Sequence, residues 1–146
     1  MRDDAALLDE AIAVACRAHH GQRYPSPERE PYIQHPLRVM LAVTSFRAQM
    51  VAVLHDVLED TALTAGDLRS AGFPDEVVAA VVAMTHRPQS TYEEYIEQVA
   101  GDPLARQVKL ADLADNLANN HRLAATPDVV ERIDRYERAI RRLRAT

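Results

Sequence analysis

The chain has 146 residues, 47% of them hydrophobic and 27% charged, which is the balance of a globular protein able to build one core. Its formal net charge of −5 argues against non-specific nucleic-acid binding, and its single cysteine, Cys16, excludes an internal disulfide. There is no signal-peptide pattern and no apolar run near the roughly 20 residues of a membrane span, so we expect one cytoplasmic domain over residues 1–146, without a membrane or nucleic-acid partner.

The N-terminal half predicts only helices. An apolar stripe over 4–19, ended by Gly21, predicts the first helix, and three prolines within 22–34 predict a loop. Pro36 suits the first turn of a second helix, which we expect to run to about Thr44. Apolar periodicity then predicts further helices over 47–59, 64–71 and 74–86.

Three capping signals mark the helices of the C-terminal half. Residues 91–94 have the form of a capping box. Asp102 before Pro103, and Thr126 before Pro127, each place an N-cap residue ahead of a proline in the first helical position. These signals predict helices over 91–100, 103–119 and 127–144. Since no stretch alternates with period two, the expected fold is all-α, a compact bundle of about seven or eight helices.

A His-Asp pair lies inside the apolar segment 47–59. Burying an imidazole and an ionised carboxylate there is costly unless a partner charge or a metal compensates them. On a continuous helix His55 would share a face with Glu59, and Asp56 with Asp60. The segment therefore predicts a wedge of one imidazole and three carboxylates. The alternative is a buried His-Asp hydrogen bond that only fixes the core.

Two further segments bear candidate ligands. The helix expected over 103–119 carries Asp112, Asp115 and Asn116 on a polar face, for which a solvated surface is the alternative interpretation. His35 lies at the entry to the second helix, where a cap or an exposed residue is the alternative. The apolar stripe expected beside that polar face consists of Leu110, Leu113, Ala114 and Leu117.

Taken together, these segments predict a metal site with four ligands: His35, His55, Asp56 and Asp112. Two imidazoles and two carboxylates suit Mn²⁺, Fe²⁺ or Zn²⁺, with waters completing the shell. Water on such an ion has a lowered pKa and can attack phosphorus or carbon. Glu59 and Asp60, one turn further on, are expected to transfer a proton or to position that water.

These residues resemble the HD superfamily of metal-dependent phosphohydrolases, whose H…HD…D pattern they follow. The resemblance extends to the hydrolase domain of RelA/SpoT-type alarmone enzymes and their small stand-alone relatives, and covers about residues 5–123. Four segments carry it. Residues 18–23 resemble A-H-x-G-Q, residues 30–36 resemble E-P-Y-I-x-H-P, residues 54–61 resemble L-H-D-V-[IL]-E-D-T, and residues 108–116 resemble V-K-L-A-D-x-x-x-N.

The resemblance implies roles for individual residues. The four ligands would hold a Mn²⁺-like ion, while Glu59 and Asp60 would act on the water and the scissile phosphate. Asn116 would help to hold the nucleotide or the water. A loop arginine would contact the guanine base, for which Arg23 is our choice and Arg29 the alternative.

One departure from the family pattern bears on the substrate. Relatives often read D-R-L-x-N after the last ligand, whereas this chain has Leu113 and Asp115. The change removes a basic residue and adds an acidic one, which predicts repulsion of an anionic substrate unless Asp115 turns away. Lys109 and Arg23 are the residues expected to neutralise phosphate or contact the base. The arginines of the segment 127–144 are expected to form a solvated face.

The leading expected function is removal of the 3′-pyrophosphate of the alarmone ppGpp, a small-molecule nucleotide, in a Mn²⁺-dependent reaction. One alternative is the same chemistry on a nucleoside monophosphate, NADPH or another phosphoester. Others are a non-catalytic nucleotide sensor and a plain helical scaffold. No synthetase segment follows the hydrolase-like region, so a bifunctional enzyme is not expected. The sequence leaves the oligomeric state open.

Overall fold

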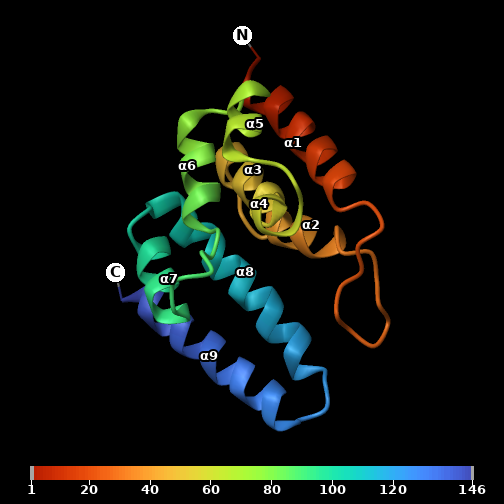
Figure 1. Ribbon diagram of the computed structural model, residues 1–146, viewed down its shortest axis with the longest axis vertical. Coiled ribbons are helices and arrows are strands. Elements are labelled where there is room, and N and C mark those ends of the chain that lie inside the picture. Colours follow the sequence, from red (N-terminus) through yellow and green to blue (C-terminus); the bar gives the residue numbers. More distant parts are fainter. Residues whose placement is uncertain (1, 146) are drawn as a thin grey trace.

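The computed structural model describes residues 2–145, which form eight helices and one additional helical turn, α4 (Figure 1). No strand occurs in this described part of the chain, and the expected all-α fold is confirmed. The elements are α1 (Asp4–Ala18), α2 (Gln34–Leu41), α3 (Phe46–Leu54), α4 (Val57–Asp60), α5 (Ala65–Ser70), α6 (Asp75–Ala83), α7 (Tyr92–Ala100), α8 (Pro103–His121) and α9 (Pro127–Arg144).

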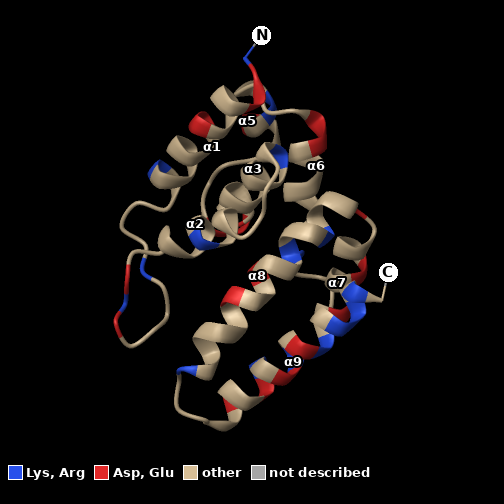
Figure 2. Cartoon of the chain, turned by 180° about the vertical axis from the view of Figure 1, so that it is seen from behind, with Lys and Arg blue, Asp and Glu red and all other residues tan. Residues whose placement is uncertain are grey.

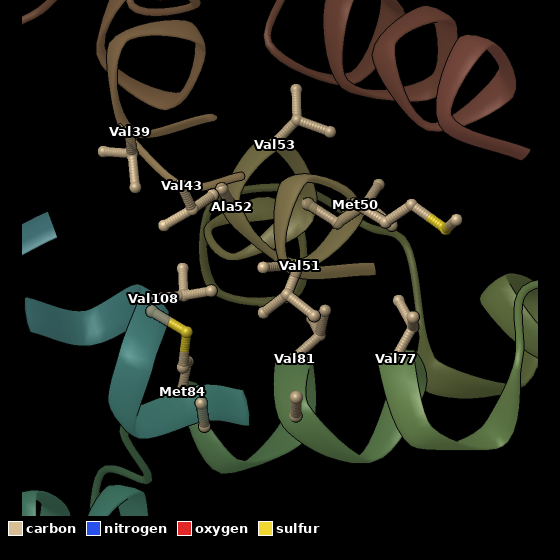
Figure 3. Close-up of a cluster of buried hydrophobic side chains, with 14 of the residues drawn as sticks. Val39, Val43, Met50, Val51, Ala52, Val53, Val77, Val81, Met84 and Val108 are labelled. Atoms are coloured by element: carbon tan, nitrogen blue, oxygen red, sulfur yellow. The ribbon is translucent and has the colours of Figure 1, made fainter. Parts of the chain in front are cut away.

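Helix α3 occupies the centre of the molecule and packs against α1, α2, α6 and α8 (Figure 1). Ala48 and every residue from 50 to 54 are buried, so the C-terminal part of the helix is apolar all round, as a segment enclosed by other helices must be. Val53 is directed toward α1 and Val51 toward Val81 of α6 (Figure 3). The core therefore surrounds α3 and fixes the position of its C-terminal end.

Helix α8 joins this core to the C-terminal pair of helices. It packs on α2, α3 and α6, and α9 runs back along it, with α7 contacting both (Figure 1). The N-caps predicted for α7, α8 and α9 are confirmed, since the side chains of Thr91, Asp102 and Thr126 each accept a hydrogen bond from a backbone N–H of the first turn. Within residues 2–145, no helix is long and apolar enough to span a membrane.

The apolar stripe expected on α8 is only partly confirmed, by Leu113 in the core and Leu110 packed against it. Leu113 is buried, but Ala114 is exposed, and Leu110 and Leu117 are only partly buried. The face against the core includes Lys109 and Asp112, because α8 is packed on two sides and these charged groups compensate each other. The polar face of α8 is thus an interior face.

The continuous helix expected over 47–59 is also wrong. Helix α3 ends at Leu54 and α4 begins at Val57, so His55 and Asp56 lie between two helices. His55 and Glu59 therefore do not lie on one continuous helix, as the shared face required. The backbone N–H of Asp60 still donates to the carbonyl of Asp56 at 3.0 Å, so Asp56 and Asp60 remain one helical turn apart. The break places the His-Asp pair at the end of the buried helix.

Other helix ends also differ from expectation. The second helix begins before Pro36, so His35 lies in the first turn of α2, and this helix ends at Leu41 instead of near Thr44. Helix α6 ends at Ala83, three residues before the expected end. Gly21 has a φ of +83° in the turn after α1, where a residue without Cβ is least strained.

Candidate metal centre and adjoining cavities

Four polar side chains converge where α2, the α3–α4 junction and α8 meet. Nε2 of His35 lies 2.8 Å from Oδ1 of Asp112 and 3.9 Å from Oδ2 of Asp56. Nε2 of His55 lies 3.2 Å from Oδ1 of Asp112 and 3.1 Å from Oδ2 of Asp56. The structure thus brings together all four residues that the sequence proposed as metal ligands, and three of them are buried.

The spacing of these atoms fits a divalent metal ion. Ligand atoms about 2.1 Å from a shared ion lie roughly 3.0–3.4 Å apart, close to most of the separations in this cluster. One atom each from His35, His55 and Asp56 lie within 4.8 Å of one another. Two imidazole nitrogens and two carboxylate oxygens form a donor set that suits Mn²⁺, Fe²⁺ or Zn²⁺. The cluster is therefore a candidate site for a divalent metal.

Each imidazole is oriented by a bond at its other nitrogen. Nδ1 of His35 donates to Oδ2 of Asp115 at 2.7 Å, and Nδ1 of His55 donates to the carbonyl of Ala52 at 2.5 Å. Both rings therefore turn Nε2 toward the carboxylates of the cluster. Metal-binding histidines are commonly oriented in this way, because the outer bond fixes both tautomer and ring plane.

The sequence raised the possibility that Asp115 faces the substrate. In the structure Asp115 lines neither cavity. Its carboxylate accepts hydrogen bonds from His35 and from the guanidinium of Arg38, with Nε at 2.8 Å and Nη2 at 3.1 Å. The positive charge of Arg38 compensates the negative charge of the Asp115 carboxylate. The repulsion of an anionic substrate expected from Asp115 is therefore not supported. No motif pointed to Arg38, although it lies one helical turn after His35.

The charges around the cluster keep its carboxylates ionised. Burial alone raises the pKa of Asp56, but the adjacent His55 outweighs it and lowers that pKa to about 2. Burial also acts against ionisation of Asp112, yet Lys109 and then His55 hold the pKa of Asp112 well below its ordinary value. Both groups are therefore carboxylates at neutral pH, the form that binds a cation.

Lys109 is the only lysine in the sequence and it is buried. Its Nζ donates to Oδ2 of Asp112 at 2.8 Å and lies 5.0 Å from the ring centroid of Tyr95. Burial lowers the pKa of Lys109, but the Asp112 carboxylate outweighs burial and raises it well above the ordinary value. The buried ammonium thus compensates the charge of a candidate ligand.

A cavity of about 330 Å³ opens beside the cluster. It is lined by three of the four candidate ligands and by three other residues that the sequence singled out: Glu59, Lys109 and Asn116. A neighbouring cavity of about 280 Å³ shares Tyr32, Asn116 and Tyr136 with it. Ligand sites generally occupy roughly 300–1,000 Å³, so the two adjoining cavities offer room for a nucleotide.

Glu59 and Asp60 differ in position. Glu59 lines the first cavity, and its carboxylate accepts a short hydrogen bond from the backbone N–H of His86. Partial burial raises the pKa of Glu59 above its ordinary value. Asp60 is not among the residues that line the cavity, and its backbone carbonyl accepts a hydrogen bond from Nε2 of Gln22 at 3.0 Å. The structure therefore brings only one of the two predicted catalytic acids to the cavity.

Asn116 lies at the boundary between the two cavities. Its Nδ2 donates to Oδ1 of Asp112 at 3.3 Å, and its Oδ1 accepts a hydrogen bond from the hydroxyl of Tyr24 at 2.8 Å. The hydroxyl of Tyr32 donates to Asp56 in a short bond. Asn116 and these two tyrosines thus connect the candidate ligands to the walls of the second cavity.

The loop arginines are not brought to either cavity. Arg23 and Arg29 are both exposed and line neither one. The second cavity is instead lined by Arg122 and Arg132, and the first by Arg135. Sequence reasoning missed these three residues as cavity residues.

Arg135 lies on α9, whose arginines were expected to form a solvated face. Basic and acidic residues do alternate along much of α9 (Figure 2), and Arg138, Arg141 and Arg144 are exposed. Arg135 is only partly exposed, so the expectation is wrong for this residue. Its spacing of four from the buried Ala139 is the signal that could have placed it on the inner side.

No protein-family model matches the chain. It is 34% identical over 122 residues to guanosine-3′,5′-bis(diphosphate) 3′-pyrophosphohydrolase MESH1 of Danio rerio, an alignment covering 78% of this chain and 67% of the relative. The Homo sapiens protein of that name is 34% identical over 139 residues, covering 88% and 76%. A solved structure described as a metazoan orthologue of SpoT that hydrolyses ppGpp superposes with a TM-score of 0.81 at 28% identity, covering 97% of this chain and 87% of the other.

Proposed function

The chain belongs to the HD-type, RelA/SpoT hydrolase-like family that contains these guanosine-3′,5′-bis(diphosphate) 3′-pyrophosphohydrolases, and we propose that it removes the 3′-pyrophosphate of ppGpp. In this reaction one water is consumed. The bond between the ribose 3′ oxygen and phosphorus breaks, a new phosphorus–oxygen bond forms, and GDP and pyrophosphate are released.

The observation that carries the proposal is the convergence of His35, His55, Asp56 and Asp112 beside a cavity that also holds Glu59. We propose that these four residues hold a divalent ion, with Mn²⁺ as the ion that the mixed nitrogen and oxygen donors and the family resemblance favour. When bound, such an ion supplies Lewis acidity toward the phosphoryl group and lowers the pKa of water.

Glu59 is assigned the proton transfer, because its carboxylate lies at the cavity and the backbone N–H of His86 holds it in place. Its raised pKa brings it closer to the working pH of a general base. Asp60 is assigned a supporting role. Partial burial, followed by the charge of Asp56, raises the pKa of Asp60.

The second cavity is the proposed site of the nucleoside. Tyr24 and Tyr32 stack with ring centroids 6.0 Å apart along one side of it, and Asn116 contributes an amide. Aromatic faces suit the stacking of a base, and amides suit its hydrogen-bonding edge. Roles for Arg23 or Arg29 at the base, and for Lys109 at a phosphate, remain predictions from the family resemblance.

A substrate panel tests the proposed function against its main alternative. Purified protein loaded with Mn²⁺ is incubated with ppGpp, NADPH and GMP, and the products are separated by anion-exchange chromatography. We expect GDP and pyrophosphate from ppGpp at a rate well above that for the other two compounds. Release of phosphate from NADPH or GMP without turnover of ppGpp would show that the substrate is another phosphoester and not the alarmone.

A further inference from the structure

Arg135 of α9 reaches the cavity that holds the candidate metal ligands. Its guanidinium carbon lies 4.8 Å from the ring centroid of Tyr92 and 5.7 Å from that of Tyr136. Contact with two aromatic faces restrains the guanidinium and leaves its N–H edge available for an acceptor. Two tyrosines thus hold Arg135 at the wall of the cavity.

Two polar atoms of this group are buried without a partner. Nε of Arg135 and the hydroxyl of Tyr92 are both buried without a hydrogen bond to any described residue. A buried donor left without an acceptor destabilises the fold, so such atoms are uncommon unless a ligand satisfies them. Both residues line the same cavity, so these two unsatisfied groups point to an acceptor that comes from outside the chain.

The neighbouring Arg138 shows that the missing partner is not a general feature of α9. Arg138 pairs through Nε with Asp134, four residues earlier, at 3.4 Å. Arg135 also has an acid four residues earlier, Glu131, but no ion pair joins them among residues 2–145. Arg135 thus lies against the tyrosines without its intrahelical partner. The other cation of the cavity, Lys109, is already bound to Asp112.

We propose that Arg135 and the Tyr92 hydroxyl bind the outer phosphate of the substrate's 3′-diphosphate, the one without a bond to ribose; this inference rests on the proposed function. The inner phosphate must lie at the metal cluster, where reaction occurs. The outer phosphate then needs a separate positive group within the same cavity, because Glu59 and the ligand carboxylates there would repel it. A guanidinium presents paired donors that match phosphate oxygens.

Binding of inorganic pyrophosphate tests this subsite directly. Isothermal titration of the Mn²⁺-loaded protein with pyrophosphate is carried out for the wild type, for Arg135→Gln and for the matched surface variant Arg138→Gln. A charge-assisted hydrogen bond contributes about 1.5–3 kcal/mol, which corresponds to about 10–100-fold in affinity. We expect Arg135→Gln to bind pyrophosphate more weakly by this factor and Arg138→Gln to bind it as the wild type does.

Two more variants keep the test independent of folding. Arg135→Lys retains the charge and should recover part of the affinity. Tyr92→Phe retains the ring and should lose about 3–10-fold through one neutral hydrogen bond. Thermal melting verifies that each variant is folded. Equal pyrophosphate affinity in folded Arg135→Gln, or in Tyr92→Phe and Arg135→Lys if the former does not fold, overturns the inference.

Steady-state kinetics separate this inference from the proposed function. If the wild type hydrolyses ppGpp and Arg135→Gln does so with unchanged kcat/KM, the subsite is refuted while the hydrolase stands. If the wild type does not hydrolyse ppGpp but pyrophosphate binding depends on Arg135, the proposed function fails and the anion subsite stands.

Discussion

Oδ2 of Asp115 lies 2.7 Å from Nδ1 of His35, the ring nitrogen opposite the one that faces Asp112. The bond crosses from α8 to α2, and Arg38 binds the same carboxylate from the next turn of α2. Asp115 therefore orients a candidate metal ligand and is itself neutralised. Asp115, which the sequence suggested would repel an anionic substrate, instead stabilises the candidate metal site through the outer nitrogen of His35.

Replacing Asp115 should weaken metal binding. In Asp115→Ala the His35 ring loses the acceptor that fixes its tautomer and orientation, and loss of such an outer partner typically costs about 10–100-fold in metal affinity. Equilibrium dialysis against Mn²⁺ measures the change. Asp134→Ala, which removes an exposed acid of α9, serves as the control. Equal Mn²⁺ affinity in wild type and Asp115→Ala would show that the contact has no such role.

Variants of Asp56 and Glu59 should differ in whether they retain the metal when activity is lost. Asp56→Ala removes a candidate ligand, so both bound metal and activity should be lost. Glu59→Gln keeps the four ligands, so metal should be retained while kcat falls by about 100-fold or more, the usual contribution of a positioned acid or base. Metal analysis of each purified protein is paired with its ppGpp turnover. Full activity in Glu59→Gln would show that Glu59 has no role in the reaction.

The rate of turnover should have an acid limb set by Glu59. Partial burial, followed by the charge of Asp56, raises the pKa of Glu59. Below that raised pKa the carboxyl is protonated and cannot accept a proton, so kcat should rise with pH and level off above it. The midpoint should lie above the ordinary range of a glutamate. Measurements of kcat at saturating Mn²⁺ test this, and a midpoint at or below the ordinary glutamate pKa would contradict it.

Lys109→Met should destabilise the protein despite a similar side-chain length. Removing the ammonium leaves the buried Asp112 carboxylate without its 2.8 Å partner, and breaking a buried pair in this way costs about 3–5 kcal/mol. Urea unfolding in the presence of a chelator measures the free energy of unfolding without a metal contribution. A change below about 1 kcal/mol would indicate that His35 and His55 alone compensate Asp112.

Much of this site could be predicted from the sequence, because its chemistry is unusual for its surroundings. A His-Asp pair in an apolar segment and an Asp in a second helix are costly to bury alone, and they do meet in space. The fold class was equally accessible, since caps such as Thr126 and Asp102 fix where helices begin. Helix ends were harder. The break after Leu54, where the His55 ring bonds to the carbonyl of Ala52, is not recorded in the apolar periodicity.

The rest depended on tertiary contacts that no local pattern encodes. Asp115 was expected to repel an anionic substrate unless it turned away, and the direction of its side chain is set by His35 and Arg38, which lie about 80 residues away in sequence. Arg135 was assigned to a solvated face because the residues around it on α9 are charged. Its proximity to Tyr92 of α7 and to Tyr136 is what places it at the cavity, whereas Arg138 pairs with Asp134.

The most direct test of the central claim is pyrophosphate release from ppGpp by the metal-free protein, by the Mn²⁺-loaded protein and by Mn²⁺-treated Asp56→Ala. We expect release of one pyrophosphate and one GDP per ppGpp only from the Mn²⁺-loaded wild type. Absence of release from wild type shown to contain Mn²⁺, or equal release from Asp56→Ala, would contradict it.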